Sequence, residues 1–410
     1  MTKKNLFYNG KRIAALSAAV MLAFAAVPFR YMAPAYATEE ADINYFDLTG
    51  VSLTDTWTTD GVTYELYDNG LLNMSGVFTG TSSNTGNKNT LDVTTTLDSA
   101  HSHGDYRDSV KAINFDVDLN NTANTIYMWG LSNLEAVKFG DTFTNSSNCL
   151  TSLSSMFYNC RNLKTVEMSG RNFGNVKTAS SMFQLCISLA SVTTSDWDLS
   201  SVTNTADMFA SCLSLTSIDV SNWNVSSDKN MQNMFAYCQK LASLDVSQWN
   251  VSSVTDMSCL FSNCYAITAL AVDDWDVSNV KTLDSTFLSC STLKSLNLNK
   301  WNTHNVTTLR CTFAGCSSIT DLNISDIDTS NVTSMDSTFS SCKAINTVDV
   351  SKWNVANVKS FLHTFSACHE LTSVDVSKWN TESATSFAGM FSDCPKLQTI
   401  DVSSFDTSNA

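Results

Sequence analysis

Residues 212–238 have the sequence CLSLTSIDVSNWNVSSDKNMQNMFAYC, and this stretch contains the pattern that decides the fold. From Cys160 to Cys394 a Cys recurs every 26 residues without insertion or deletion, and a Phe stands three residues before each one. A Trp stands eleven residues after the Cys in seven of the ten units. One fixed period is typical of repeat proteins, in which each unit buries its apolar side only by stacking on its neighbours. The ladder cysteines are Cys160, Cys186, Cys212, Cys238, Cys264, Cys290, Cys316, Cys342, Cys368 and Cys394.

Each unit divides into a strand, a turn and a second apolar stretch. Apolar and polar residues alternate toward the end of 215–221, as in a strand with one buried face. Asn and Ser follow Trp223, and both residue types favour turns. In 254–261 the apolar residues stand at offsets 0, 3, 6 and 7, which predicts a short helix with an Asp or Asn cap. The pattern predicts an α/β-type, leucine-rich-repeat-like solenoid: a right-handed coil with a parallel concave β-sheet and short convex helices.

The first 37 residues are typical of a signal peptide. Lys3 and Lys4 precede an apolar run from Ile13 to Val27, and Ala35-Tyr36-Ala37 offers a small-x-small cleavage site. The alternative is an uncleaved anchor helix, which is disfavoured because the apolar run is shorter than the ~18 residues that a span requires. The signal predicts a secreted or cell-surface protein, and its total length favours a Gram-positive source.

Two further regions follow the signal. Residues 38–108 do not follow the period, and strand-like runs around 62–67 and 71–78 predict a small N-terminal β cap. Residues 109–410 are predicted to form the solenoid, with about ten repeats of which the last is incomplete. Because Ala410 falls in the middle of a unit, we expect the chain to be a fragment of a longer protein.

Composition and charge exclude several classes of function. The net charge is −15, and removal of a signal with five positive and no negative residues leaves −20. No basic run follows the signal, so we expect no nucleic-acid partner. The sequence has no second apolar stretch that could span a membrane, so we expect no membrane insertion after the signal is removed. There is no phosphate loop, dinucleotide fingerprint or nucleophile elbow, so we expect no enzymatic activity and no cofactor. His101 and His103 form only a short loop cluster, a weak metal signal.

The repeat resembles that of BspA-like leucine-rich repeat surface proteins of bacteria. The strand, the W-[DN]-[VTL]-S-[NS]-V motif, M-F and the Cys all fall in that family's register, over roughly 109–410. The resemblance implies a surface-exposed bacterial protein, often an adhesin or a host-interaction protein. Asp228 and Ala384 depart from the usual Val, and Thr286, Thr312, Thr338 and Thr364 replace the Met before Phe.

The Cys ladder and the Trp ladder each have a structural and a chemical interpretation. Ten aligned cysteines suggest disulfides or a metal array, but parallel side chains do not point toward one another and no ladder position has a partnering His. We therefore expect buried free thiols and no metal site. The Trp ladder is either a carbohydrate-stacking surface or core packing, and packing is favoured because Ile327 and Phe405 replace Trp.

The strand face offers the better candidate for a binding surface. Positions five, seven and nine after each Cys are polar and should project to solvent. Such an acidic and hydroxyl-rich surface suits a basic or glycosylated host or bacterial surface protein, or weakly held Ca²⁺. The alternatives are a merely solvated strand face, a stiff spacer for a distal domain, and the scaffold of a larger surface enzyme. The predicted partner-binding residues, here called the middle row, are Asp219, Asp245, Asn297, Asn323, Asp349, Asp375 and Asp401.

Overall fold

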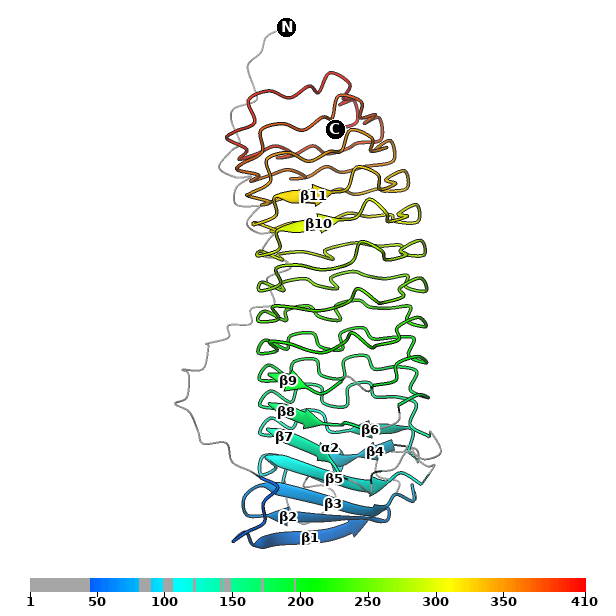
Figure 1. Ribbon diagram of the computed structural model, residues 1–410, viewed down its shortest axis with the longest axis vertical. Helices are drawn as coiled ribbons and strands as arrows, with labels where there is room; N and C mark the ends of the chain where they lie inside the picture. The colour runs from blue at the N-terminus through cyan, green and yellow to red at the C-terminus, as the bar shows by residue number, and fades with distance from the viewer. Residues whose placement is uncertain are drawn as a thin grey trace. The chain divides into compact units, whose positions relative to one another are not determined.

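The computed structural model describes residues 45–80, 90–98, 106–120, 123–140, 143, 149–170, 173–194 and 197–410. Residues 45–410 form one compact unit. In this unit each coil of the chain lies on the one before it, from the blue strands to the red final coils (Figure 1). The predicted signal peptide and the pair of histidines at 101 and 103 lie outside the described residues.

The stack begins with an antiparallel meander that continues into a parallel sheet. β1 pairs with β2 and β2 with β3 in antiparallel fashion, and β3 then pairs with β5 in parallel. The sheet order is β1-β2-β3-β5-β7-β8-β9, and one apolar core runs from Trp57 to Met390. Described residues of the predicted cap therefore contribute to the same sheet and core as the coils. The meander and first parallel strands are β1 (Leu53–Thr59), β2 (Val62–Tyr67), β3 (Leu71–Val77), β5 (Ala112–Asp118), β7 (Ala136–Phe139), β8 (Thr165–Glu167) and β9 (Ser191–Val192).

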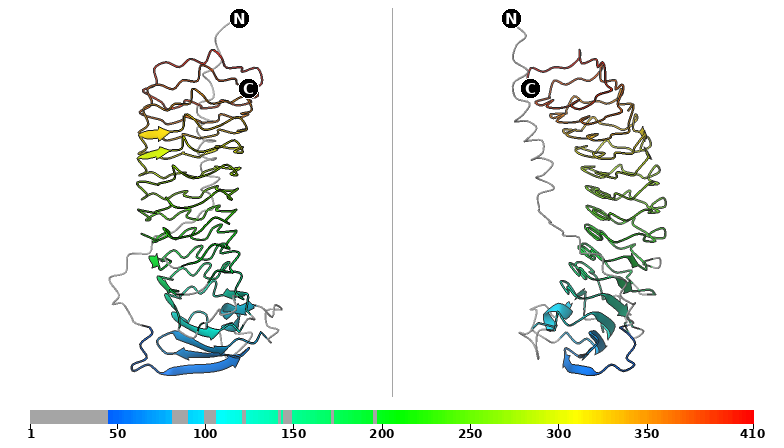
Figure 2. Two further views of the ribbon diagram at one scale, coloured as in Figure 1. Left: turned by 45° about the vertical axis from the view of Figure 1, so that its right-hand side comes forward. Right: turned by 90° about the vertical axis from the view of Figure 1, so that its left-hand side faces the viewer.

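Short elements complete the description. β4 pairs in parallel with β6 beside the first coils, and β10 pairs with β11 further along the stack (Figures 1 and 2). The single α-helix of the described residues, α2, is four residues long and precedes the regular array. These elements are β4 (Thr90–Asp92), α2 (Val93–Thr96), β6 (Thr125–Tyr127), β10 (Ser295–Asn297) and β11 (Asp321–Asn323).

The predicted convex helices are wrong for the described coils. The segment that precedes each Cys is instead a run of tight turns whose backbone N–H groups alternate between two kinds of partner. In a helix, all of these N–H groups would bond to carbonyls of their own coil. Here every second N–H group bonds to a carbonyl of the next coil. The N–H groups of Leu260, Ser262 and Cys264 bond to carbonyls three residues earlier, and those of Cys259, Phe261 and Asn263 bond to the carbonyls of Asp284 (2.9 Å), Thr286 (2.9 Å) and Leu288 (2.6 Å).

Two left-handed residues in almost every described coil make this run of turns possible. In the same segment Cys259 has φ 56° and Asn263 has φ 61°. Ser, Asn and Asp recur at these two positions, and Asn and Asp tolerate positive φ better than most residues. Of the three cysteines outside the ladder, Cys259 and Cys311 occupy the first left-handed position and not a helix face.

The strand segment keeps the predicted alternation, with less pairing than predicted. Ile218 and Val220 are buried, whereas Ser217 and Asp219 are exposed. Among the ten 26-residue units, strands are formed at this place in those of β8, β9, β10 and β11. The most continuous pairing is instead a row of single parallel bridges at the start of the turn segment, which runs through Ser152, Thr178, Asn204, Asn230, Asp256 and Thr282.

Many polar groups inside the coils are satisfied in one recurring way. Nine ladder cysteines, most of the ladder Trp side chains and the four buried Thr that replace Met donate to a backbone carbonyl 29 residues earlier, in the preceding coil. Cys186 Sγ donates to Phe157 O at 3.1 Å, and Thr286 Oγ1 donates to Met257 O at 3.1 Å. A buried hydroxyl without such a partner would cost about 1–3 kcal/mol, so this pattern explains how Thr replaces Met in four coils. Trp249 Nε1 donates to Val220 O at 3.0 Å in the same way.

Candidate functional site

The strand face places the middle row at the surface, one residue per coil. Six of the seven residues are exposed and Asn297 is half-buried. The buried neighbours on either side, such as Ile218 and Val220 around Asp219, fix the direction in which each polar side chain points. The structure therefore brings the predicted residues onto one face, at successive levels of the stack.

Each Asp of the middle row also closes a local turn. Asp219 Oδ1 accepts hydrogen bonds from the backbone N–H of Ser221 at 3.1 Å and from its hydroxyl at 2.7 Å. The same pair of bonds, with the same two distances, holds Asp245, Asp349 and Asp375 to the Ser two residues later. For these four carboxylates, no hydrogen bond to Oδ2 is found among the described residues, so one oxygen holds the turn and the other faces solvent.

These bonds keep the middle row ionised. Hydrogen bonds from Ser221 lower the pKa of Asp219, and the nearby charge of Asp245 opposes this only in part. Hydrogen bonds from the following Ser likewise lower the pKa of the other Asp residues of the row. The row therefore presents a series of fixed negative charges at neutral pH.

The charge of the strand face is not uniform. Toward the C-terminal end, Lys352 and Lys378 lower the pKa values of Asp349 and Asp375 respectively, so positive charge lies beside that part of the row. No Lys or Arg contributes in this way at Asp219 or Asp245. Lys352 and Lys378 stand three residues after Asp349 and Asp375, where Asn222 and Gln248 follow Asp219 and Asp245, so the sequence shows this asymmetry only when that position is compared between units. Asp219 and Asp245 are thus two neighbouring Asp residues of the middle row without a Lys beside them.

Neither a cluster of potential metal ligands nor a membrane-spanning helix is found in the part of the chain that the structure describes. Within it, no three or more His, Cys, Asp or Glu side chains are grouped closely enough to hold a metal ion. The same residues contain no helix of the length and apolarity that a membrane crossing needs.

The Cys and Trp ladders lie inside the coils. Nine of the ten ladder cysteines are buried, and burial raises the pKa of thiols such as Cys264 and Cys316 to about 12. The seven Trp side chains are only 1–4% exposed, so they pack in the core and offer no surface on which a sugar could stack. Among them, Trp197 Nε1 is buried without a hydrogen bond to any described residue.

The state of the cysteines can be tested by counting thiols. The ten ladder cysteines, Cys259 and Cys311 form no disulfide, so we expect at least twelve reactive thiols per chain after denaturation without reductant. In the native protein Cys394 should react first with iodoacetamide, because it is only partly buried and the neighbouring Cys368 lowers its pKa. A count near zero in the denatured protein, measured by mass spectrometry after alkylation, would show that the ladder is paired.

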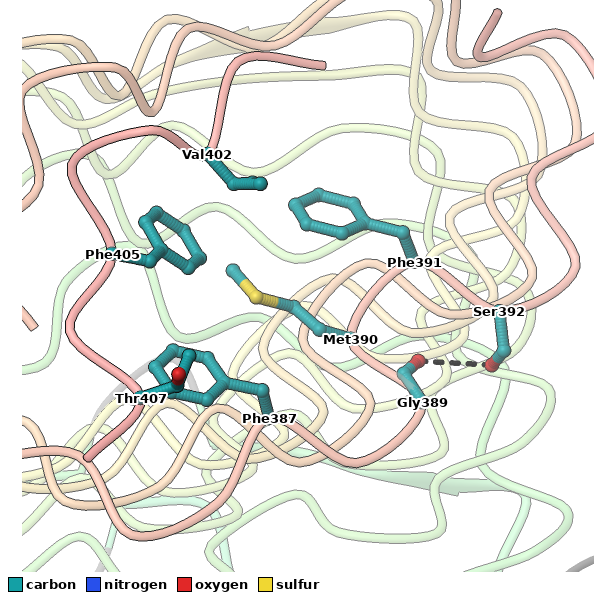
Figure 3. Close-up of a pocket in the computed structure, with 8 residues that line it drawn as sticks. All are labelled: Phe387, Gly389, Met390, Phe391, Ser392, Val402, Phe405 and Thr407. Carbon is teal, nitrogen blue, oxygen red and sulfur yellow. Dashed lines mark hydrogen bonds between the residues drawn. The ribbon is translucent and has the colours of Figure 1, made fainter. Parts of the chain in front are cut away.

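A hollow lies in the last coils and is lined by apolar side chains. Phe387, Met390, Phe391, Val402 and Phe405 surround it (Figure 3). Phe391 and Phe405 hold the Phe and Trp positions of the repeat, and both continue the stacks of the preceding coils. The hollow is therefore made of core ladder positions and contains no separate constellation of polar groups.

The coils are stacked, their Cys, Phe and Trp ladders are buried, and each coil adds one residue to an exposed polar row. These features define a leucine-rich-repeat-like solenoid. The chain belongs to the family described as Mycoplasma protein of unknown function, DUF285, whose model matches residues 151–268, 229–347 and 310–410. This agrees with the BspA-like character of the repeat. A comparison with curated proteins found no match.

Two solved bacterial proteins are similar over most of the chain. One is a leucine rich cell surface protein from Faecalibacterium prausnitzii, with 16% identity, a TM-score of 0.31, and coverage of 85% of this chain and 95% of that one. The other is a leucine-rich repeat protein from Eubacterium ventriosum, with 13% identity, a TM-score of 0.31, and coverage of 86% and 97%.

Proposed function

We propose that this protein is a secreted or cell-surface adhesin that holds a basic or glycosylated protein partner on its strand face. The observation that carries the proposal is the repeated Asp–Ser turn, which fixes one carboxylate oxygen of each coil and leaves the other toward solvent. The typical signal sequence supports an extracellular location.

The affinity of such a face must come from several coils acting together. A single exposed ion pair contributes only about 0–1 kcal/mol. Carboxylates held on a rigid scaffold lose little freedom on binding, and like charges at successive levels attract a basic partner before contact. The pair Asp219 and Asp245 should contribute most, because no Lys lowers their pKa values.

Charge-neutral variants can test the proposal without disturbing the turns. In Asp219→Asn with Asp245→Asn, the amide oxygen still accepts the bonds from Ser221 and Ser247, so only charge is lost. Asp198→Asn with Asp276→Asn is the matched control. Those two exposed residues form the same kind of turn with Ser200 and Ser278, outside the strand segment, and the change in net charge is identical.

We expect the middle-row variant to bind immobilised poly-L-lysine about tenfold more weakly than the control variant, at equal thermal stability. Surface plasmon resonance at low and high salt would measure the difference, which should shrink as salt screens the charges. Equal weakening by both variants would contradict a specific role of the strand face. It would favour the spacer, for which the continuous coil-to-coil hydrogen bonds already provide the stiffness.

A further inference from the structure

Two tyrosines are exposed where the rest of the array has few large apolar side chains at the surface. Tyr237 is 40% exposed and Tyr265 is 39% exposed. Among the described residues from 151 onward, the one other large hydrophobic side chain this exposed is Val402, which lines the hollow of the last coils. The two tyrosines come from neighbouring coils, and neither is part of the strand face.

A single asparagine connects the two tyrosines. The backbone N–H of Tyr237 bonds to the carbonyl of Ser262 at 2.7 Å, which places Tyr237 beside the Ser262–Asn263 backbone of the next coil. The Tyr265 hydroxyl donates to Asn263 Oδ1 at 3.0 Å, and Asn263 Nδ2 donates to Ser262 Oγ at 2.8 Å. Asn263 thus orients the Tyr265 ring, and it directly follows Ser262, the residue to which Tyr237 is hydrogen-bonded.

The backbone of Tyr237 argues that the fold does not select this residue. Tyr237 has φ 61°, a left-handed conformation that is unfavourable for a bulky side chain. Apart from Leu185, the other regular coils place small or polar residues there, including Ser211, Asn263, Ser289, Gly315 and Ser341. A strained aromatic residue whose ring remains at the surface is better explained by contact with a ligand than by packing.

The residues aligned with the two rings in the adjacent coils are uncharged. Partial burial raises the pKa of both phenols, and no Lys, Arg, Asp or Glu contributes to either shift. In the repeat register, Tyr237 stands between Ser211 and Asn263, and Tyr265 stands between Gln239 and Ser291. These aligned positions offer amides and hydroxyls, and they contain neither the carboxylates that a cation needs nor the lysines that an anion needs.

We propose that Tyr237, Tyr265 and Asn263 form a binding site for a neutral saccharide. Aromatic rings present a broad apolar face on which the C–H face of a pyranose can pack, and the amides and hydroxyls at their edges match sugar hydroxyls. Two rings at successive levels of the stack suit consecutive sugar units of a chain. This site is separate from the strand face and does not rest on the proposed adhesion through the middle row.

The test uses mature protein and a panel of neutral oligosaccharides, namely cellohexaose, maltohexaose, chitohexaose and mannohexaose, in isothermal titration calorimetry. We expect at least one to bind the natural protein. Tyr237→Asn and Tyr265→Ser should each weaken this binding at least tenfold, while Val402→Ser leaves it unchanged. Both substitutions install a residue that other coils carry at the same position, so the proteins should fold. Tyr237→Asn should be as stable as the natural protein or more stable, because the strain is relieved.

Two results would overturn the saccharide site. One is that no oligosaccharide of the panel binds; the other is that binding persists in both tyrosine variants. Loss of a protein partner in the tyrosine variants, together with no saccharide binding, would assign the patch to protein docking instead. The Asp219→Asn and Asp245→Asn protein should keep full saccharide binding, so failure of this site and failure of the strand-face proposal can be told apart.

Discussion

Asp228→Asn is expected to make the protein more stable than its natural form at neutral pH. The free energy of unfolding of the variant, relative to that of the natural protein, should be about 3 kcal/mol higher at neutral pH than at about pH 4. Asp228 is 1% exposed and stands where most coils have Val, as at Val202 and Val254. Burial raises the pKa of its carboxyl to about 6, although hydrogen bonds from Thr205 and from the N–H of Asn230 oppose this.

The direction of the pH effect follows from the two protonation states. In the unfolded chain an Asp has a pKa near 3.9, so the folded protein binds the proton more tightly than the unfolded one. The stability from this site is complete below about pH 4, falls as the pH rises to about 6, and is constant above. The pKa difference corresponds to about 3 kcal/mol, and Asn keeps the acceptor for Thr205 without the charge.

Urea unfolding of the natural protein and the variant across this pH range measures the effect. Asp219→Asn is the control, because the pKa of that exposed carboxyl is lowered and its contribution must change in the opposite direction. Parallel stability curves for natural protein and Asp228→Asn would contradict a charged, buried Asp228.

Trp249→Ala is expected to destabilise the array by about 3–5 kcal/mol, the usual cost of removing a large buried aromatic side chain. Trp249 is 4% exposed and stacks between Trp223 and Trp275, with ring centroids 6.2 Å away on each side. Its Nε1 also satisfies the carbonyl of Val220. Since each coil contacts mainly its neighbours, the loss should weaken the coupling between the two halves of the stack.

Two further variants separate the contributions. Trp249→Phe keeps most of the apolar volume and loses the hydrogen bond to Val220, so we expect a cost of about 1–2 kcal/mol. Phe405→Ala removes a partly buried ring in the last coil and should cost less than Trp249→Ala. Thermal unfolding monitored by Trp fluorescence provides the comparison. If Trp249→Ala were no worse than Phe405→Ala, the stacked ladder would not be a continuous core.

The period of the sequence was sufficient to predict the ladders and the exposed row. Residues such as Phe235 and Cys238 recur at one spacing, and an array of stacked coils turns any such recurrence into a continuous line of contacts. The alternation at Ile218, Asp219 and Val220 predicted which side chains face solvent, because strand geometry has a period of two.

The turn segment could not be predicted from apolar spacing alone. Offsets of three and four residues fit a helix, but they also fit successive turns that return apolar side chains to the same side. The informative signal was the recurrence of Ser, Asn and Asp at the positions of Cys259 and Asn263, where the backbone is left-handed. The hydrogen bonds of Thr205 to Asp228 and of Asn233 to Asp207 join residues of neighbouring coils at single positions, and no period reveals them.

The most direct test of the account is to remove one period from the mature chain. Excision of residues 265–290 joins Cys264 to Ser291 and keeps the Cys, Phe and Trp ladders, with their hydrogen bonds to the preceding coil, in register. Excision of 267–290 removes two residues fewer and shifts all later positions out of register. We predict that the first protein unfolds cooperatively at nearly the natural temperature, whereas the second is strongly destabilised. Equal stability of the two proteins, or loss of folding in the first, would contradict a fold built from equivalent 26-residue coils.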